Sequence, residues 1–224
     1  MTGNVLVRGF LAATLLVGTV ATAAPPAAAQ GLGAPVKSIL GDASDSALDK
    51  LSEPGAFYAD KAIRILLPGP LKKASKLLKY TDQAGLTGNL TKSLNDAAGL
   101  AAKEAKPIFR NAINDMTLQD GIGVVSKTDG ATRYLQESAG DDLHARVRPL
   151  VADALGNVGA FDQFDKLGGK SALLSGAGLS RDGLTDSVTD QALKGIFKYI
   201  GAEEAKLRAD PLSAGKKLLK GIKK

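Results

Sequence analysis

Apolar residues recur three or four positions apart along most of the chain, which is the spacing of helices that bury one face. The clearest stripe follows Thr185 and consists of Val188, Ala192, Leu193, Ile196, Phe197 and Ile200. No pair of strands is signalled, since runs of alternating apolar and polar residues are missing from the sequence. The pattern therefore predicts an all-α protein, a single domain of about eight helices without a sheet.

Two prolines lie inside predicted helices, Pro107 within residues 86–116 and Pro149 within residues 141–155. Because proline lacks a backbone donor and clashes with the preceding turn, we predict a kink or break at each of them. The β-branched run Ala62–Leu67 departs from the helical period and ends at a Pro-Gly-Pro turn. Since no partner strand is available, we predict an extended segment laid across the core.

The N-terminus has the pattern of a secretory signal peptide. Arg8 is the only charge before the apolar run Phe10–Val20, and small residues then lead to Ala27-Ala28-Ala29. An apolar run followed by an A-x-A site is typical of signal peptidase substrates, and this run is too short to span a membrane comfortably. We predict that residues 1–29 are a cleaved signal peptide.

The rest of the chain is predicted to consist of a flexible Gly/Pro-containing lead-in at 30–41 and a helical domain at 42–224. It holds no second long apolar stretch, and the chain contains no cysteine to carry a lipoprotein anchor. We therefore expect a soluble exported protein, periplasmic in a Gram-negative source. Without cysteine it forms no disulfides, so its stability depends on helix packing.

The chain is basic, with 29 Lys and Arg against 23 Asp and Glu and a formal net charge of +6. Much of the excess lies in two segments that also carry leucines, and their candidate membrane-surface contacts are Lys72, Lys73, Lys76, Lys79, Lys216, Lys217 and Lys220. Basic amphipathic helices can lie on anionic membrane surfaces, while the alternative is a solvated face. Aromatic residues make up only 4%, which disfavours a base-stacking surface, and with the export signal we expect no nucleic-acid partner.

No motif completes a cofactor or metal site, and we predict neither. Gly168-Gly169-Lys170-Ser171 resembles part of a phosphate-binding loop, but Phe164 stands where the first glycine is needed. Asp141 and His144 have a spacing that can chelate a metal on a helix, yet no second ligand cluster accompanies them. Favourable interaction of the acidic residues with the helix dipole is the simpler explanation.

The best paired carboxylates are Asp186 with Asp190 and Glu203 with Glu204, and a hydrolase would use Asp186, Asp190 or Glu203. Asp186 and Asp190 lie four residues apart, on one face of the helix predicted after Thr185, and Glu203 follows in the same region. A hydrolase can use such a pair, but the polar face of an amphipathic helix has the same appearance. An uncharacterised hydrolase is therefore a remote alternative, and no catalytic residue is assigned.

Four ordered stretches resemble a known bacterial family. They are Ile63–Leu71, Ala105–Asp120, Ala131–Leu135 with Arg148–Val151, and Leu184–Phe197. Their sequences resemble the domain of unknown function 4197 family, with departures at Gly69, where the family usually carries an acid, and at Leu135, where an aromatic is usual. The resemblance implies an exported helical protein and brings no established activity.

These observations favour a non-catalytic exported binding module for an apolar or lipid-like ligand or an envelope partner protein. Proline-broken helices can enclose a cavity, and cavities between helices are common ligand sites. Arg64, Arg133 and Arg148 are candidate headgroup or anion contacts there, with structural salt bridges as their alternative use. Peripheral association with an anionic membrane surface is the alternative function. The oligomeric state is left open.

Overall fold

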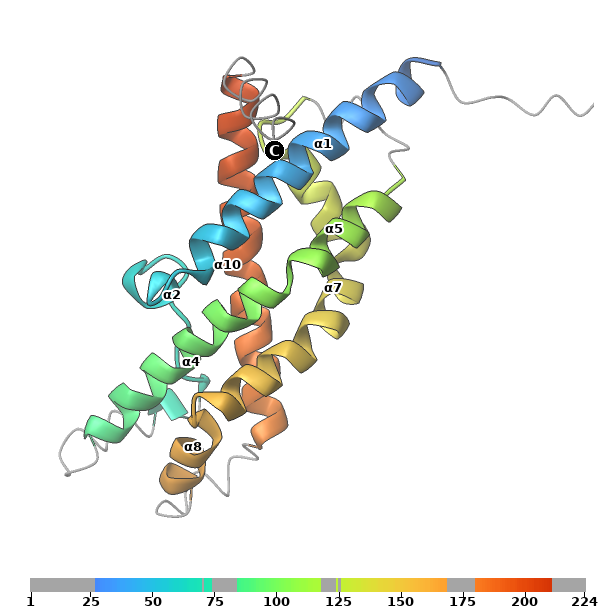
Figure 1. The fold of residues 1–224 in the computed structure, drawn as a ribbon. Helices are drawn as coiled ribbons and strands as arrows, with labels where there is room; N and C mark the ends of the chain where they lie inside the picture. The colour runs from blue at the N-terminus through green and yellow to red at the C-terminus, as the bar shows by residue number, and fades with distance from the viewer. Residues whose placement is uncertain are drawn as a thin grey trace, which may run out of the picture.

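The computed structural model describes residues 27–69, 71–73, 84–117, 124, 126–168 and 180–210. Within them the protein is an elongated helical bundle without strands (Figure 1), so the predicted all-α fold is confirmed. The helices are α1 (Ala27–Ser52), α2 (Ala56–Ala59), α4 (Ala84–Glu104), α5 (Lys106–Asp115), α7 (Gly130–Asn157), α8 (Ala160–Gly168) and α10 (Arg181–Ala209). None of the described helices is long and apolar enough to cross a membrane.

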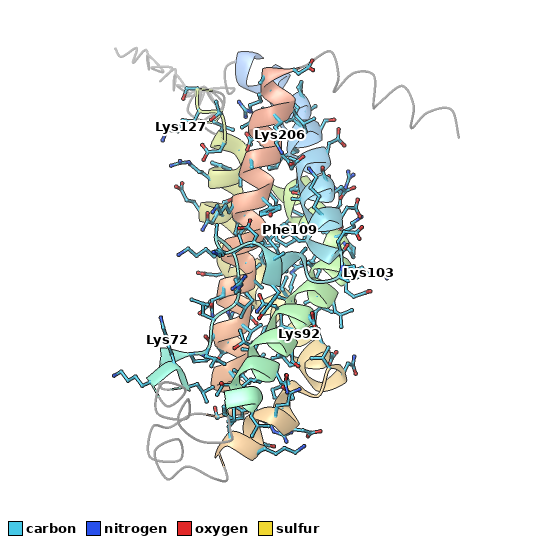
Figure 2. The ribbon with its side chains drawn as sticks, turned by 90° about the vertical axis from the view of Figure 1, so that its left-hand side faces the viewer. Lys72, Lys92, Lys103, Phe109, Lys127 and Lys206 are labelled. Atoms are coloured by element: carbon cyan, nitrogen blue, oxygen red, sulfur yellow. The ribbon has the colours of Figure 1, made fainter. Side chains whose placement is uncertain are left out.

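Helix α10 runs most of the length of the bundle and packs against both α1 and α7. The stripe predicted from Val188 to Ile200 is buried throughout. At mid-length, Phe197 meets Phe109 of α5 edge to face, with ring centroids 5.8 Å apart (Figure 2). The apolar periodicity therefore identified the face of α10 around which the core is built.

The two internal prolines have different outcomes. At Pro107 the predicted break is confirmed, because α4 ends at Glu104 and α5 begins at Lys106. At Pro149 there is no break, because α7 continues as one helix from Gly130 to Asn157. Pro149 and Ala145, whose carbonyl loses its helical donor, are both exposed, so water can satisfy that carbonyl.

The predicted flexible lead-in at 30–41 is wrong, because these residues form part of α1. Val36 and Leu40 are buried in the core, and they continue the apolar stripe of the helix toward the N-terminus. Pro35 is accommodated inside the helix. Residues 1–26 of the predicted signal peptide lie outside the described residues.

The extended segment predicted from Ala62 crosses the core as expected, and two side-chain amides bind its backbone. The Ile65 N–H donates to Oδ1 of Asn95 (2.8 Å), and Nδ2 of Asn95 donates to the Ile65 carbonyl (2.9 Å). On the other side, the Leu66 N–H and carbonyl pair in the same way with the Gln191 amide at 2.9 and 3.1 Å. Asn95 of α4 and Gln191 of α10 thus replace the neighbouring strands that an extended backbone requires.

Candidate functional site

A groove of about 1010 Å³ lies between α7 and α10, and Ala62 contributes to its lining. Its lining on α10 includes Gly201, Ala202 and Ala205, none of which carries a side chain larger than a methyl group. The two helices approach closely there, since a Cβ on Gly201 would lie 3.4 Å from the Cβ of Asp129. The groove therefore has a floor of small residues along α10.

Charged side chains border this floor on both helices. On α10, Lys194 and Lys198 are exposed and lie one helical turn apart. Within the described residues, neither ammonium group is within ion-pair distance of a carboxylate. On α7, Nε of Arg133 donates to Oδ2 of Asp129 at 2.9 Å, and the exposed Glu137 follows one turn later. The α10 rim is thus basic, while the α7 rim carries both signs.

A buried carboxylate beside the groove anchors the start of α7. Glu204 of α10 is completely buried and accepts hydrogen bonds from the backbone N–H groups of Ala131 (3.0 Å) and Thr132 (2.8 Å). It also accepts from the Thr132 hydroxyl at 2.6 Å and pairs with Arg208 at 2.7 Å. A negative charge at these N–H groups is favourable because they form the positive end of the helix dipole. Glu204 therefore fixes α7 against α10 at the end of the groove.

The sequence pairs Glu204 with Glu203 as candidate carboxylates for acid–base chemistry, and it does not predict this buried structural role. The Asp129 side chain makes no capping hydrogen bond at the start of α7 and binds Arg133 instead. The sequence signal for this role is the position of Glu204 relative to the apolar stripe. Glu204 follows Ile200 by one turn, so it is an acidic residue on the buried stripe of α10.

Glu203, one of the carboxylates considered for hydrolysis, joins α10 to α1. Its carboxylate accepts from the Ser46 hydroxyl (3.0 Å), Nζ of Lys50 (2.7 Å) and Nζ of Lys206 (2.8 Å). Burial raises the pKa of the Glu203 carboxyl, but the hydrogen bonds from Lys206, Lys50 and Ser46 and the charge of Lys50 outweigh it and lower the pKa from 4.5 to about 2. So acidic a carboxyl is ionised at neutral pH and fits an ion-pair role better than that of a proton donor.

Glu203→Gln is expected to lower the free energy of unfolding by about 2 kcal/mol at neutral pH, less than the full pKa shift because both lysines are solvent-exposed. The folded pKa lies below the unfolded value, so this contribution is complete above about pH 4.5 and is lost as the pH falls toward 2. Urea titrations at several pH values measure it, with Glu53→Gln at an exposed site as control. A gap between wild type and Glu203→Gln that stays constant down to pH 3 would contradict it.

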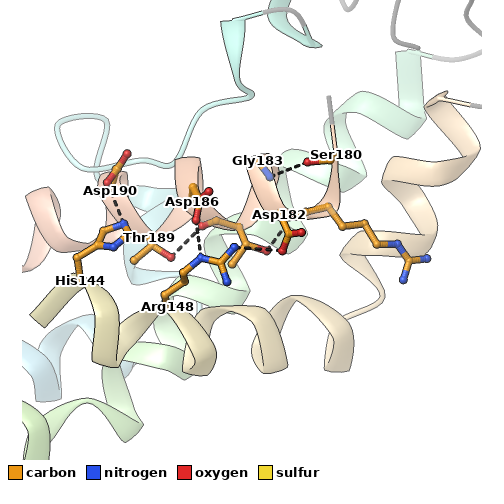
Figure 3. A network of polar contacts seen from close by, with 10 residues as sticks. His144, Arg148, Ser180, Asp182, Gly183, Asp186, Thr189 and Asp190 are labelled. Carbon is orange, nitrogen blue, oxygen red and sulfur yellow. Dashed lines mark hydrogen bonds and ion pairs between the residues drawn. The ribbon is translucent and has the colours of Figure 1, made fainter. Parts of the chain in front are cut away.

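The other two carboxylates also bind across helices (Figure 3). Asp186 accepts from Nε of Arg148 at 2.5 Å, and Asp182 accepts from Nη2 of the same arginine at 3.1 Å. Asp190 lies 3.2 Å from Nε2 of His144. Asp186 and Asp190 thus connect α10 to α7 through separate partners, and neither lines the groove.

The three candidate arginines are not brought together. Arg64 donates from Nε to the Tyr58 carbonyl at 2.6 Å and lies over the Tyr58 ring. Arg148 is held by two aspartates, as described above. Of the three, only Arg133 lines the groove. The described residues also hold no group of three or more His, Cys, Asp or Glu side chains suited to a metal ion.

The lysines considered for membrane contact are only partly described. Lys72 and Lys73 are exposed, and Lys72 projects away from the bundle (Figure 2). Leu71, beside them, is 2% exposed and belongs to the core, so it is not available to insert into a lipid surface. The remaining candidates, Lys76, Lys79, Lys216, Lys217 and Lys220, lie outside the described residues.

Comparison with known proteins gives one match. A family model described as "Protein of unknown function (DUF4197)" matches residues 27–222, which is most of the chain. This is the family that the motifs in the sequence resemble. No curated protein and no solved structure is significantly similar to the chain.

Proposed function

We propose that this chain, which belongs to the DUF4197 family of proteins of unknown function, is a non-catalytic binding module that holds its ligand in the groove between α7 and α10. The observation that carries the proposal is the groove itself, about 1010 Å³ in volume with a floor of small residues. The signal-peptide pattern of residues 1–29 supports a place of action outside the cytoplasm, so the ligand would belong to the cell envelope.

The surroundings of the groove support binding rather than chemistry. The carboxylates considered for hydrolysis are engaged elsewhere, since Asp186 binds Arg148 and Asp190 faces His144. Glu203 is held by two lysines on the α1 side of α10. The groove instead offers a long, partly apolar floor between charged rims, which suits an elongated ligand with one apolar face.

Thiol protection tests the proposal without assuming which ligand binds. The chain has no cysteine, so Ala202→Cys places a single thiol on the groove floor, where Ala202 is exposed. We expect this thiol to be alkylated at least severalfold more slowly in envelope extract of the source organism than after purification, because the ligand covers it.

Ala145→Cys is the matched control. Ala145 is an exposed residue in the middle of α7 and does not line the groove, so its alkylation rate is expected to be the same in extract and in purified protein. Equal protection at both positions, or no protection at Ala202→Cys, would contradict a ligand in the groove. Far-UV circular dichroism of the two variants checks that both remain folded.

A further inference from the structure

We infer that the ligand of the groove is an acidic amphipathic helix of a partner protein. The inference rests on the proposed function, because it takes the groove between α7 and α10 as the binding site. It goes further in naming the chemistry of the occupant. An amphipathic helix bound in a surface groove is a common mode of peptide recognition.

The length and floor of the groove fit a helix. Its lining on α10 extends from Lys194 to Ala205, which is about 17 Å or three helical turns. Along the second half of this path the floor consists of Gly201, Ala202 and Ala205. Gly201 faces Asp129 and Thr132, but at Ala202 and Ala205 no side chain longer than a methyl group rises from α10, so the backbone of a third helix can approach closely there.

The charges on the rims select an acidic flank on that helix. Lys194 and Lys198 lie four residues apart on α10, so they present two positive charges one turn apart along one side of the groove. Carboxylates four residues apart on a partner helix have the same repeat. On the opposite rim Arg133 is paired with Asp129, and the two charges cancel. The net charge of that rim is therefore the single negative charge of Glu137. The basic side is therefore the one that distinguishes between partners.

An acyl chain fits the same lining less well. Phe197 is the only large apolar residue that lines the groove, and it is only 6% exposed. The remaining apolar positions are alanine and glycine, and charged residues border the floor on both helices. An acyl chain takes its binding energy from the apolar area removed from water and offers no polar groups to these rims. A polypeptide helix can place its own polar residues against the rims.

The lysine-rich C-terminal segment of the chain has the wrong charge to occupy the groove. Residues 211–224 contain five lysines and no acidic residue. Beside Lys194 and Lys198 their like charges would be destabilising. The complementary partner is therefore acidic, which a second molecule can supply.

Two helical peptides of about 16 residues provide the test. They share an Ala/Leu stripe, and one carries Glu and the other Lys at positions four apart on one flank. In fluorescence anisotropy at low ionic strength, the Glu peptide is expected to bind wild-type protein at least about tenfold more tightly than the Lys peptide. The variant Lys194→Glu/Lys198→Glu is expected to reverse this preference.

The control Lys103→Glu/Lys166→Glu changes the net charge equally at exposed sites on α4 and α8 and is expected to keep the wild-type preference. Equal binding of the two peptides, or a preference that the groove variant leaves unchanged, would overturn the inference. Binding to phosphatidylglycerol vesicles that depends on Lys194 and Lys198, without peptide binding, would overturn it in favour of a lipid. If Ala202→Cys is protected but neither peptide is preferred, the proposal of a binding module is supported and the inference of a helical ligand is overturned.

Discussion

Replacing Glu204 with alanine is expected to lower the free energy of unfolding by about 3–5 kcal/mol. The change removes a completely buried negative charge that pairs with Arg208 and accepts from three groups of Ala131 and Thr132. The two backbone N–H groups at the start of α7 would then be buried without an acceptor, and the mostly buried guanidinium of Arg208 would lose its ion pair with Glu204. Urea unfolding followed by far-UV circular dichroism measures the loss.

Two further variants separate the causes. Glu204→Gln keeps an acceptor oxygen and the side-chain volume but removes the charge, so we expect a smaller loss of about 2 kcal/mol. Glu137→Ala, at an exposed position of the same two-helix interface, is expected to stay within about 0.5 kcal/mol of wild type. A loss below about 1 kcal/mol for Glu204→Ala would show that α7 is not anchored by this carboxylate.

Asn95→Ala is expected to cost about 3 kcal/mol, the second largest effect. It leaves the N–H and carbonyl of Ile65 without their partners, although Ile65 is completely buried. Water cannot replace the amide there without opening the contact between α4 and the extended segment. The same urea titration measures the loss.

The equivalent change on the other side is the control. Gln191 binds the N–H and carbonyl of Leu66, but Leu66 is 49% exposed, so water can replace the lost hydrogen bonds. Gln191→Ala is therefore expected to cost only about 1 kcal/mol. Similar losses for Asn95→Ala and Gln191→Ala would contradict the idea that burial of Ile65 makes the difference.

The parts of the fold that depend on local pattern were predictable from sequence. The apolar stripe of α10 through Ile196 and Ile200 identified its buried face, and Pro107 marked the break between α4 and α5. The extended segment was expected because a β-branched run had no partner strand. Its actual partners, Asn95 and Gln191, lie 30 and 125 residues away from it, so no local signal pointed to them.

The candidate site depended on long-range packing, and there sequence reasoning was less successful. Arginines were singled out for their charge, yet of the three only Arg133 reaches the groove. Glu204, which binds the start of α7, is more than 70 residues away in the chain, so no local signal indicated this role. The position of the groove could not be predicted from the sequence, since the groove exists only where the small residues of α10 face α7.

The central position of α10 has a consequence for how the protein is made. The partners of α10 come from early in the sequence: Glu203 binds Ser46 at a separation of 157 residues, and Tyr199 binds Asp60 at a separation of 139. A nascent chain that ends before Arg181 therefore lacks the helix on which both α1 and α7 pack. Contacts this distant slow folding, and the contacts of α1 and α7 with α10 form only after residues 181–209 have been synthesised.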